Sequence, residues 1–133
     1  MKLLLDTHIF LWYISGDPQL SEEWQALLRD PDNQVYLSVV SVWEASIKYR
    51  LGKLPLPSPP ESYLPEQRSR HMIASLALEE SAILHMASLP GIHRDPFDRI
   101  MVCQALDNDL TLVTVDTAIR QYAVKLLPNG DRT

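Results

Sequence analysis

Short apolar runs alternate along this chain with segments whose apolar positions recur at helical spacing. Residues 3–5 are all leucine and are closed by Asp6 and Thr7, which predicts a strand buried on both faces of a sheet. Further strands are expected at 34–37, 72–76 and 111–115, with a last short one at 124–127. Helices are expected over 9–14, from Ser21 to the turn at 31–33, and over 39–51, 61–70, 79–88, 96–106 and 117–122.

Glycine and proline mark the breaks between these elements. Gly16 and Pro18 end the first helix, and Gly52 ends the helix that begins at residue 39. Residues 53–60 hold four of the ten prolines and predict an extended loop. Strands alternating with helices predict an α/β fold, with helices on both faces of a mainly parallel sheet. We expect one domain over residues 1–128 and a flexible tail at 129–133.

Composition narrows the class of protein. The 133 residues carry 12 basic and 17 acidic side chains, a formal charge of −5, which excludes a uniformly basic nucleic-acid coat protein. The single cysteine excludes an internal disulfide and a cysteine-rich zinc site, and it favours a reducing compartment. No apolar run approaches the ~18–20 residues of a membrane span. The sequence therefore predicts a cytoplasmic protein.

Four acidic residues occupy informative positions. Asp6 and Asp116 each follow a predicted strand, at the edge where parallel α/β sheets bind ligands. Glu44 lies at helical spacing among apolar residues, which places a carboxylate on an apolar stripe made of Val40, Ile47 and Leu51.

Asp98 likewise shares a helical face with apolar residues, namely Met101, Val102 and Ala105. Buried carboxylates are rare unless they are paired or bind a metal.

Each acid also has a purely structural interpretation. Asp6 and Asp116 are each positioned to cap the helix that follows. Asp95 before Pro96 is a strong cap signature, and Asp98 then falls in the first helical turn, where acids are favoured. Ser41 and Glu44 have the spacing of a capping box.

Taken together, the acids favour a metal site. Each pair of carboxylates ~5 Å apart costs roughly 3 kcal/mol at an effective dielectric constant of about 20. Several such pairs would rival the ~5–15 kcal/mol stability of a whole domain, so a cation or bound protons must compensate. Oxygen ligands suit Mg²⁺ or Mn²⁺, and such sites run phosphoryl chemistry.

Four motifs, in order and spacing, resemble those of PIN-domain nucleases, and more narrowly of VapC-type toxins from bacterial toxin–antitoxin pairs. The resemblance spans residues 2–127 and covers nearly the whole chain. The motifs are Leu3-Leu4-Leu5-Asp6-Thr7-His8, Ser38-Val39-Val40-Ser41-Val42-Trp43-Glu44, His93-Arg94-Asp95-Pro96-Phe97-Asp98-Arg99 and Leu112-Val113-Thr114-Val115-Asp116.

This resemblance implies a three-layer α/β/α sandwich and an endoribonuclease that depends on Mg²⁺ or Mn²⁺. It assigns metal binding and catalysis to Asp6, Glu44, Asp98 and Asp116. It also implies a small antitoxin that covers the site, and a toxin homodimer. Beside the carboxylates, Thr7 and Thr114 are expected as supporting hydroxyls, and Asp95 as an outer acid.

Candidate substrate contacts are cationic. Residues 48–70 carry a net charge of +3, and Lys48 among them is a candidate for binding RNA phosphates. Arg94 and Arg99 flank the third motif and are further candidates, with an ion pair to the acids as the competing interpretation for Arg99. His8 and His93 are expected to make hydrogen bonds in turns, because the metal chemistry needs no histidine.

Other function classes stay open at this point. A Mg²⁺-binding phosphoacceptor domain has a similar fold, but it needs two adjacent acids after its first strand, and only Asp6 is present here. A binding-only relative would show a broken set of four acids, whereas this set is intact. A metal-dependent DNA nuclease is compatible with the composition.

Overall fold

A computed structural model describes residues 1–128 of the chain. Its elements follow the expected alternation of strands and helices. In chain order they are β1 (Lys2–Leu5), α1 (Thr7–Ser15), α2 (Glu22–Arg29), β2 (Gln34–Ser38), α3 (Val39–Arg50), α4 (Pro60–Arg70), β3 (Ala74–Leu76), α5 (Glu80–Leu84), the 3₁₀ helix η1 (His85–Ser88), α6 (Pro96–Asn108), β4 (Thr111–Val113) and the 3₁₀ helix η2 (Ile119–Gln121).

The four strands form one parallel sheet in the order β3-β2-β1-β4. The all-leucine run of β1 occupies a central position, with β2 and β4 on either side, and is fully buried. A strand covered on both faces has no solvent side, which is why its sequence does not alternate with polar residues. The carboxyl ends of β1 and β4 lie at the same edge of the sheet because the two strands are parallel.

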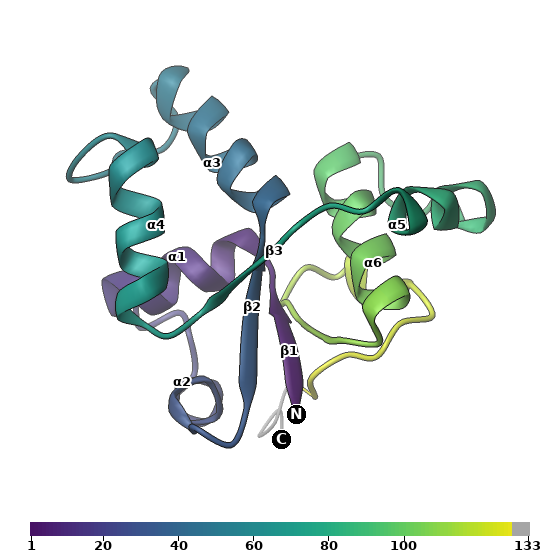
Figure 1. The fold of residues 1–133 in the computed structure, drawn as a ribbon, viewed down its shortest axis with the longest axis horizontal. Helices are drawn as coiled ribbons and strands as arrows, with labels where there is room; N and C mark the ends of the chain where they lie inside the picture. The colour runs from purple at the N-terminus through teal and green to yellow at the C-terminus, as the bar shows by residue number, and fades with distance from the viewer. Residues whose placement is uncertain (129–133) are drawn as a thin grey trace.

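Helices cover both faces of the sheet, with α1, α2, α3 and α4 on one side and α5 and α6 on the other (Figure 1). The buried side chains divide accordingly into two clusters. Leu3 and Leu5 pack with Phe10 and Trp24, whereas Leu4 packs with Val102 of α6. Alternate residues of one strand point to opposite faces, so β1 contributes to both clusters. The predicted three-layer α/β/α sandwich is confirmed.

Several element boundaries differ from the predictions. The helix expected over 79–88 is a short α5 followed by η1, and the helix expected over 117–122 is only the 3₁₀ turn η2. The strand expected at 124–127 is reduced to one parallel bridge between Leu112 and Leu126. The tail expected at 129–133 lies outside the described residues.

The surface of α3 corrects one prediction. Its buried residues are Val40, Ser41, Glu44 and Ala45. Ile47 and Leu51, which were expected on the buried stripe, are 36% and 63% exposed. Positions 40, 41, 44 and 45 share the helical face that meets the protein interior, and the helix then runs past the sheet edge. The apolar residues further along α3 therefore reach solvent.

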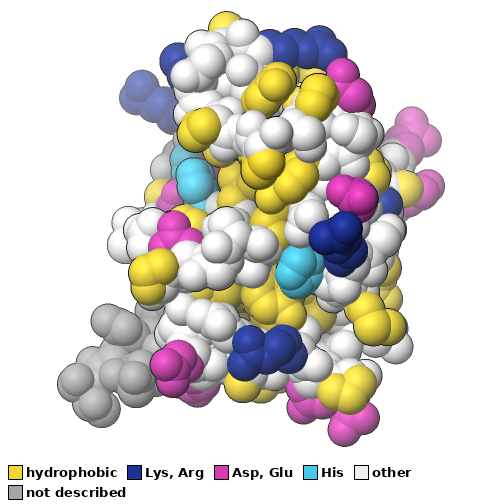
Figure 2. Space-filling model, turned by 90° about the vertical axis from the view of Figure 1, so that its left-hand side faces the viewer, with side chains coloured by type: hydrophobic (Ala, Val, Ile, Leu, Met, Phe, Trp, Pro, Cys, Tyr) yellow, Lys and Arg dark blue, Asp and Glu magenta, His cyan; other side chains and the backbone are white. Residues whose placement is uncertain are grey.

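The outer face of α1, α2 and α4 carries a hollow of about 760 Å³ beside Gln34 and Val35, where β2 begins. Figure 2 shows this side of the molecule, with hydrophobic side chains between groups of cations. None of the four predicted carboxylates lines the hollow, since they lie at the opposite ends of the strands. Among the described residues, no helix is long and apolar enough to span a membrane.

Candidate active site

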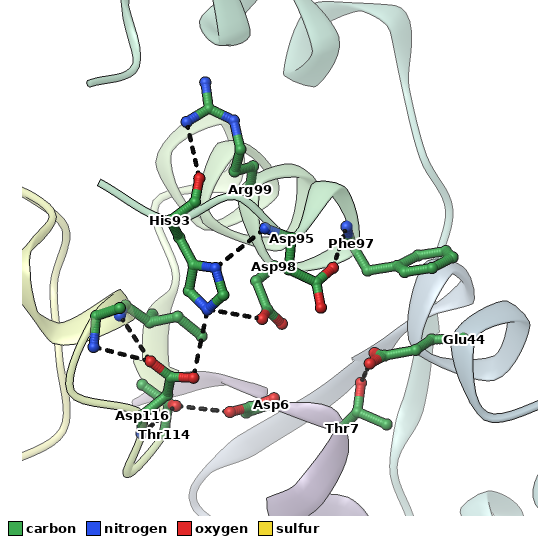
Figure 3. A network of polar contacts seen from close by, with 12 residues as sticks. Asp6, Thr7, Glu44, His93, Asp95, Phe97, Asp98, Arg99, Thr114 and Asp116 are labelled. Atoms are coloured by element: carbon green, nitrogen blue, oxygen red, sulfur yellow. Dashed lines mark hydrogen bonds and ion pairs between the residues drawn. The ribbon is translucent and has the colours of Figure 1, made fainter. Parts of the chain in front are cut away.

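Carboxylates from four parts of the fold point toward one another at the carboxyl edge of the sheet (Figure 3). Asp6 directly follows β1, and Asp116 lies three residues after β4. Glu44 comes from α3, and Asp98 from the first turn of α6. The parallel sheet brings the first two acids to one edge, and the two helices carry the others over it.

Asp6 is held by a threonine hydroxyl. The carboxylate is 5% exposed, and its Oδ2 accepts a hydrogen bond of 2.6 Å from Thr114 Oγ1. Burial raises the pKa of Asp6, and the charges of Glu44 and Asp116 raise it further, against the lowering effect of the Thr114 bond. Asp6 also begins α1, but its side chain makes no capping bond, so the capping interpretation is wrong.

Glu44 uses both carboxylate oxygens. Oε1 accepts a bond of 2.9 Å from Thr7 Oγ1, and Oε2 lies 2.8 Å from Lys48 Nζ. The predicted substrate contact Lys48 is therefore paired with the acid one turn before it, and the hydrogen bond to Glu44 raises the pKa of Lys48. Ser38 caps α3, so Ser41 and Glu44 do not form a capping box.

Asp98 is partly buried beside other carboxylates. The pKa of its carboxyl is raised to about 7, first by burial and then by the charges of Asp6, Asp95 and Glu44. Asp95 caps α6 as its sequence position predicts, with Oδ1 accepting the Phe97 N–H at 2.9 Å. Because Asp95 serves as the cap, Asp98, one turn further along α6, is the acid of this helix that interacts with Asp6 and Glu44.

Asp116 divides its oxygens between two roles. Oδ1 accepts the N–H groups of Ala118 and Ile119 at 2.8 and 3.0 Å, which is the predicted cap. Oδ2 instead lies 3.4 Å from His93 Nε2, and that nitrogen lies 3.1 Å from Asp98 Oδ2. The capping and the site interpretations are both satisfied, one by each oxygen.

One atom each from His93, Asp98 and Asp116 lies within 4.8 Å of the other two, which is close enough to hold one metal ion. Asp6 and Glu44 are not in this group. Their charges nevertheless reach Asp98 strongly enough to raise its pKa. The sequence indicated the acids but not His93, whose turn hydrogen bond to the Asp95 N–H is present at 3.1 Å beside its contact with the carboxylates.

The two arginines near the site differ in their contacts. Arg99 Nη1 donates to Pro90 O, His93 O and the Tyr122 hydroxyl at 3.0, 3.3 and 3.4 Å. It therefore orders the loop before α6, and this side chain makes no ion pair with an acid of the described residues. Arg94 is exposed beside the site.

A family model for the PIN domain matches residues 3–125. This chain belongs to the PIN-domain family. The match includes all four carboxylates, so the family assignment and the observed cluster concern the same part of the molecule. The sequence resemblance to PIN domains is confirmed.

Known proteins similar to this PIN domain include Ribonuclease VapC16 of Mycobacterium tuberculosis, which is 40% identical over 63 residues. That match covers 47% of this chain and 45% of the relative, so the chain spans less than half the length of this relative. Among solved structures, VapBC2 from Rickettsia felis, bound to a DNA fragment from its promoter, superposes with a TM-score of 0.72 at 19% identity, over 96% of this chain and 98% of that one. A toxin–antitoxin complex from Klebsiella pneumoniae gives 0.55 at 19% identity, over 86% and 87%. These two likenesses show the fold.

Proposed function

We propose that this PIN domain is an endoribonuclease that depends on Mg²⁺ or Mn²⁺ and serves as the toxin of a toxin–antitoxin pair. One observation carries the catalytic part of the proposal. Burial and, after it, the charges of three neighbouring carboxylates raise the pKa of Asp98 to about 7. A fold that concentrates negative charge in this way is stabilised when a cation binds there.

The donor chemistry fits a hard divalent cation. Asp98 and Asp116 offer carboxylate oxygens within one ion's reach, and Asp6 and Glu44 offer more oxygens nearby. We expect Asp98 and Asp116 to hold the cation, with Asp6 and Glu44 binding directly or through water. When bound, such a cation supplies Lewis-acid activation of water and neutralises charge on a phosphodiester.

The chain's own residues prepare this site. Thr114 and Thr7 hold Asp6 and Glu44 by donating to one oxygen of each carboxylate. Lys48 partly neutralises Glu44, and its side chain is 39% exposed, so it is still available to an RNA phosphate. Arg94, exposed beside the site, is the second phosphate contact that we propose. Arg99 has its role in the loop, and we propose that it supports substrate binding only through that loop.

Relatives support the choice of RNA and of an antitoxin partner. The partly matching Mycobacterium protein is named a ribonuclease, and a structural neighbour is a toxin–antitoxin complex. We also propose a cytoplasmic location, where RNA substrates are available. A homodimer remains part of the proposal, and light scattering of the purified chain tests it.

The surface next to Glu44 fits a covering partner. We define the α3 stripe as Val39, Trp43, Ile47 and Leu51, which are 39%, 58%, 36% and 63% exposed and recur every four residues. Trp43 contacts Phe97, the residue before Asp98, at a ring distance of 5.0 Å. An antitoxin segment that covers the α3 stripe therefore blocks access to the carboxylates. Co-purification with the product of an adjacent reading frame tests this partner.

Cleavage of total RNA by the purified chain tests the activity. The reaction is run with Mg²⁺, with Mn²⁺ and with EDTA, beside the variant Asp98→Asn. We expect cleavage with either cation, none with EDTA, and a loss of at least about a hundredfold in the variant, because one metal-holding carboxylate becomes a neutral amide.

Two outcomes would contradict the proposal. Cleavage that persists in EDTA and in Asp98→Asn would assign the activity to another site or to a contaminant. If no RNA is cut, calorimetric titration with Mg²⁺ distinguishes two cases. A chain that binds Mg²⁺ has an intact site, and its specific RNA target is then absent from the sample. A chain that binds no Mg²⁺ is a binding-only PIN domain, which contradicts the proposal.

A further inference from the structure

His93 is anchored on three sides in the loop before α6. Its backbone N–H donates to the hydroxyl of the buried Tyr122 at 2.8 Å, and its carbonyl oxygen accepts from Arg99 at 3.3 Å. Its ring nitrogen Nδ1 accepts the backbone N–H of Asp95 at 3.1 Å. The backbone of His93 is therefore held by two contacts, and the bond to Nδ1 sets the direction of its ring in the metal-free protein.

The Nδ1 contact determines where the ring carries its proton. A backbone N–H can only donate, so Nδ1 must be the acceptor and carries no hydrogen in this arrangement. The neutral ring then has its hydrogen on Nε2. Nε2 lies 3.1 Å from Asp98 Oδ2 and 3.4 Å from Asp116 Oδ2. His93 thus presents an N–H to two carboxylates at once (Figure 3).

The same contact argues against His93 as a metal ligand. A ligating Nε2 must be unprotonated, and the neutral ring would then carry its hydrogen on Nδ1, facing the Asp95 N–H. Two donors cannot share one hydrogen bond. Although one atom of His93 lies within 4.8 Å of the two aspartates, its hydrogen bonding makes it a donor to them.

We propose that His93 is a positioning residue whose Nε2–H holds Asp98 and Asp116 together in the metal-free protein and competes with the cation for the same two oxygens. Only the competition depends on the proposed function, because that function supplies the cation. Without a donor between them, the two carboxylates repel each other. With the cation bound, the N–H and the positive ion oppose each other, so the ring must give up its contact.

Nuclear magnetic resonance of the histidine rings tests the first half of this proposal. Long-range ¹⁵N–¹H correlation spectra of the full chain in EDTA report which ring nitrogen carries the hydrogen, and His93→Gln assigns the signal. We expect His93 with its hydrogen on Nε2. His71 is an internal reference with the opposite arrangement, because its Nδ1 lies 2.8 Å from Gln67 O, which can only accept. A His93 ring with its hydrogen on Nδ1 would overturn the proposal.

Calorimetric titration with Mg²⁺ tests the second half. His93→Leu removes the donor, and we expect it to bind Mg²⁺ about tenfold more tightly than the unmodified chain, while its melting temperature in EDTA falls. His93→Gln keeps an amide N–H and is expected to return both values toward those of the unmodified chain. His71→Leu, distant from the carboxylates, is the matched control with unchanged affinity.

A purely structural His93 would give a different pattern. Both His93 variants would then melt at lower temperature, and neither would bind Mg²⁺ more tightly, which would refute the competition. If His93→Leu does not fold, the spectrum of the unmodified chain with added Mg²⁺ decides, because a bound cation must shift the His93 signal and leave that of His71 unchanged. A chain that binds no Mg²⁺ contradicts the proposed function, whereas the hydrogen position in EDTA still tests His93.

Discussion

The hydroxyl of Thr114 connects two carboxylates of the site. It donates to Asp6 Oδ2 at 2.6 Å and accepts the backbone N–H of Asp116 at 3.0 Å, and the residue is fully buried. A hydroxyl can do both at once, whereas an apolar side chain of the same shape can do neither. One small side chain thus sets the relative positions of the acids that follow β1 and β4.

Thr114→Val is therefore expected to destabilise the protein and to weaken the site. The change leaves the Asp116 N–H without its acceptor and the Asp6 carboxylate without its donor, at a cost of about 1–3 kcal/mol in the free energy of unfolding. Urea unfolding measures this cost, and Mg²⁺ titration measures the change at the site. Thr114→Ser retains the hydroxyl and is expected to stay close to the unmodified chain. A loss in Thr114→Ser with little loss in Thr114→Val would show that the methyl group, and not the hydroxyl, is what matters.

The sequence predicted the acids better than their partners. Asp6 and Asp116 were placed correctly because parallel strands end at one edge of the sheet, and this topology follows from local apolar runs. The pairing of Lys48 with Glu44 has the i,i+4 spacing of a helical ion pair, so the sequence does contain a signal for it. The contact of His93, in contrast, depends on a loop anchored by Tyr122, 29 residues away. No local pattern reports a contact of that kind.

At the scale of elements, the end of α4 has an unusual residue. Met72 adopts a left-handed backbone with φ of 58°, and its side chain is 87% exposed. The Ile73 N–H bonds to Arg68 O at 2.9 Å and the Met72 N–H to Ser69 O at 3.1 Å, which is the Schellman arrangement. Glycine is the usual residue at this position, because a Cβ atom is strained there.

Met72→Gly is expected to stabilise the protein by about 0.5–1 kcal/mol, since relief of the left-handed strain outweighs the added freedom of the unfolded chain. Thermal or urea unfolding measures the gain. Met72→Ala removes the same exposed side chain but keeps Cβ, so it should bring no gain. Gly16→Ala, at φ of 68° after α1, is the reverse test and should destabilise by about 1 kcal/mol. A loss of stability in Met72→Gly would mean that the exposed methionine makes contacts worth more than the strain.

Elements were predictable where the sequence is locally consistent. The apolar run at residues 3–5 predicts a strand, and the cap signature Asp95-Pro96 predicts the start of a helix. The observed β1 and the start of α6 lie close to these predictions. The segment 79–88 has helical composition, but it changes to a 3₁₀ turn at His85, whose Nε2 lies 3.3 Å from Asp107 of α6. On the predicted stripe of α3, Val40 is buried, whereas Ile47 and Leu51 reach solvent further along the helix.

At the scale of the whole molecule, repulsion among the carboxylates of the site lowers the stability of the metal-free fold. The chain has a formal charge of −5, and Asp6, Glu44, Asp98 and Asp116 converge at one edge of its sheet. Hydrogen bonds from Thr7 and Thr114, the charge of Lys48 and the Nε2–H of His93 offset part of this repulsion. Burial first, and the remaining repulsion second, raises the pKa of Asp6 and of Asp98. The metal-free fold is therefore expected to become less stable as these groups ionise.

This expectation fixes how stability depends on pH. The pKa of Asp98 is about 7 in the folded chain, against an ordinary value of 3.8, so between these values the folded state binds more protons than the unfolded state. The contribution of Asp98 to stability in EDTA is therefore fully present below about pH 3.8 and is lost as the pH rises through about 7. Urea unfolding at pH 5 and pH 7.5 measures the difference, and Asp98→Asn, which cannot ionise, should flatten it. Saturating Mg²⁺ binds the ionised form and should reverse the slope, giving the more stable protein at pH 7.5. A metal-free protein that is more stable at pH 7.5 than at pH 5 would mean that Asp98 is ionised without strain, and the main argument for a cation at this site would be lost.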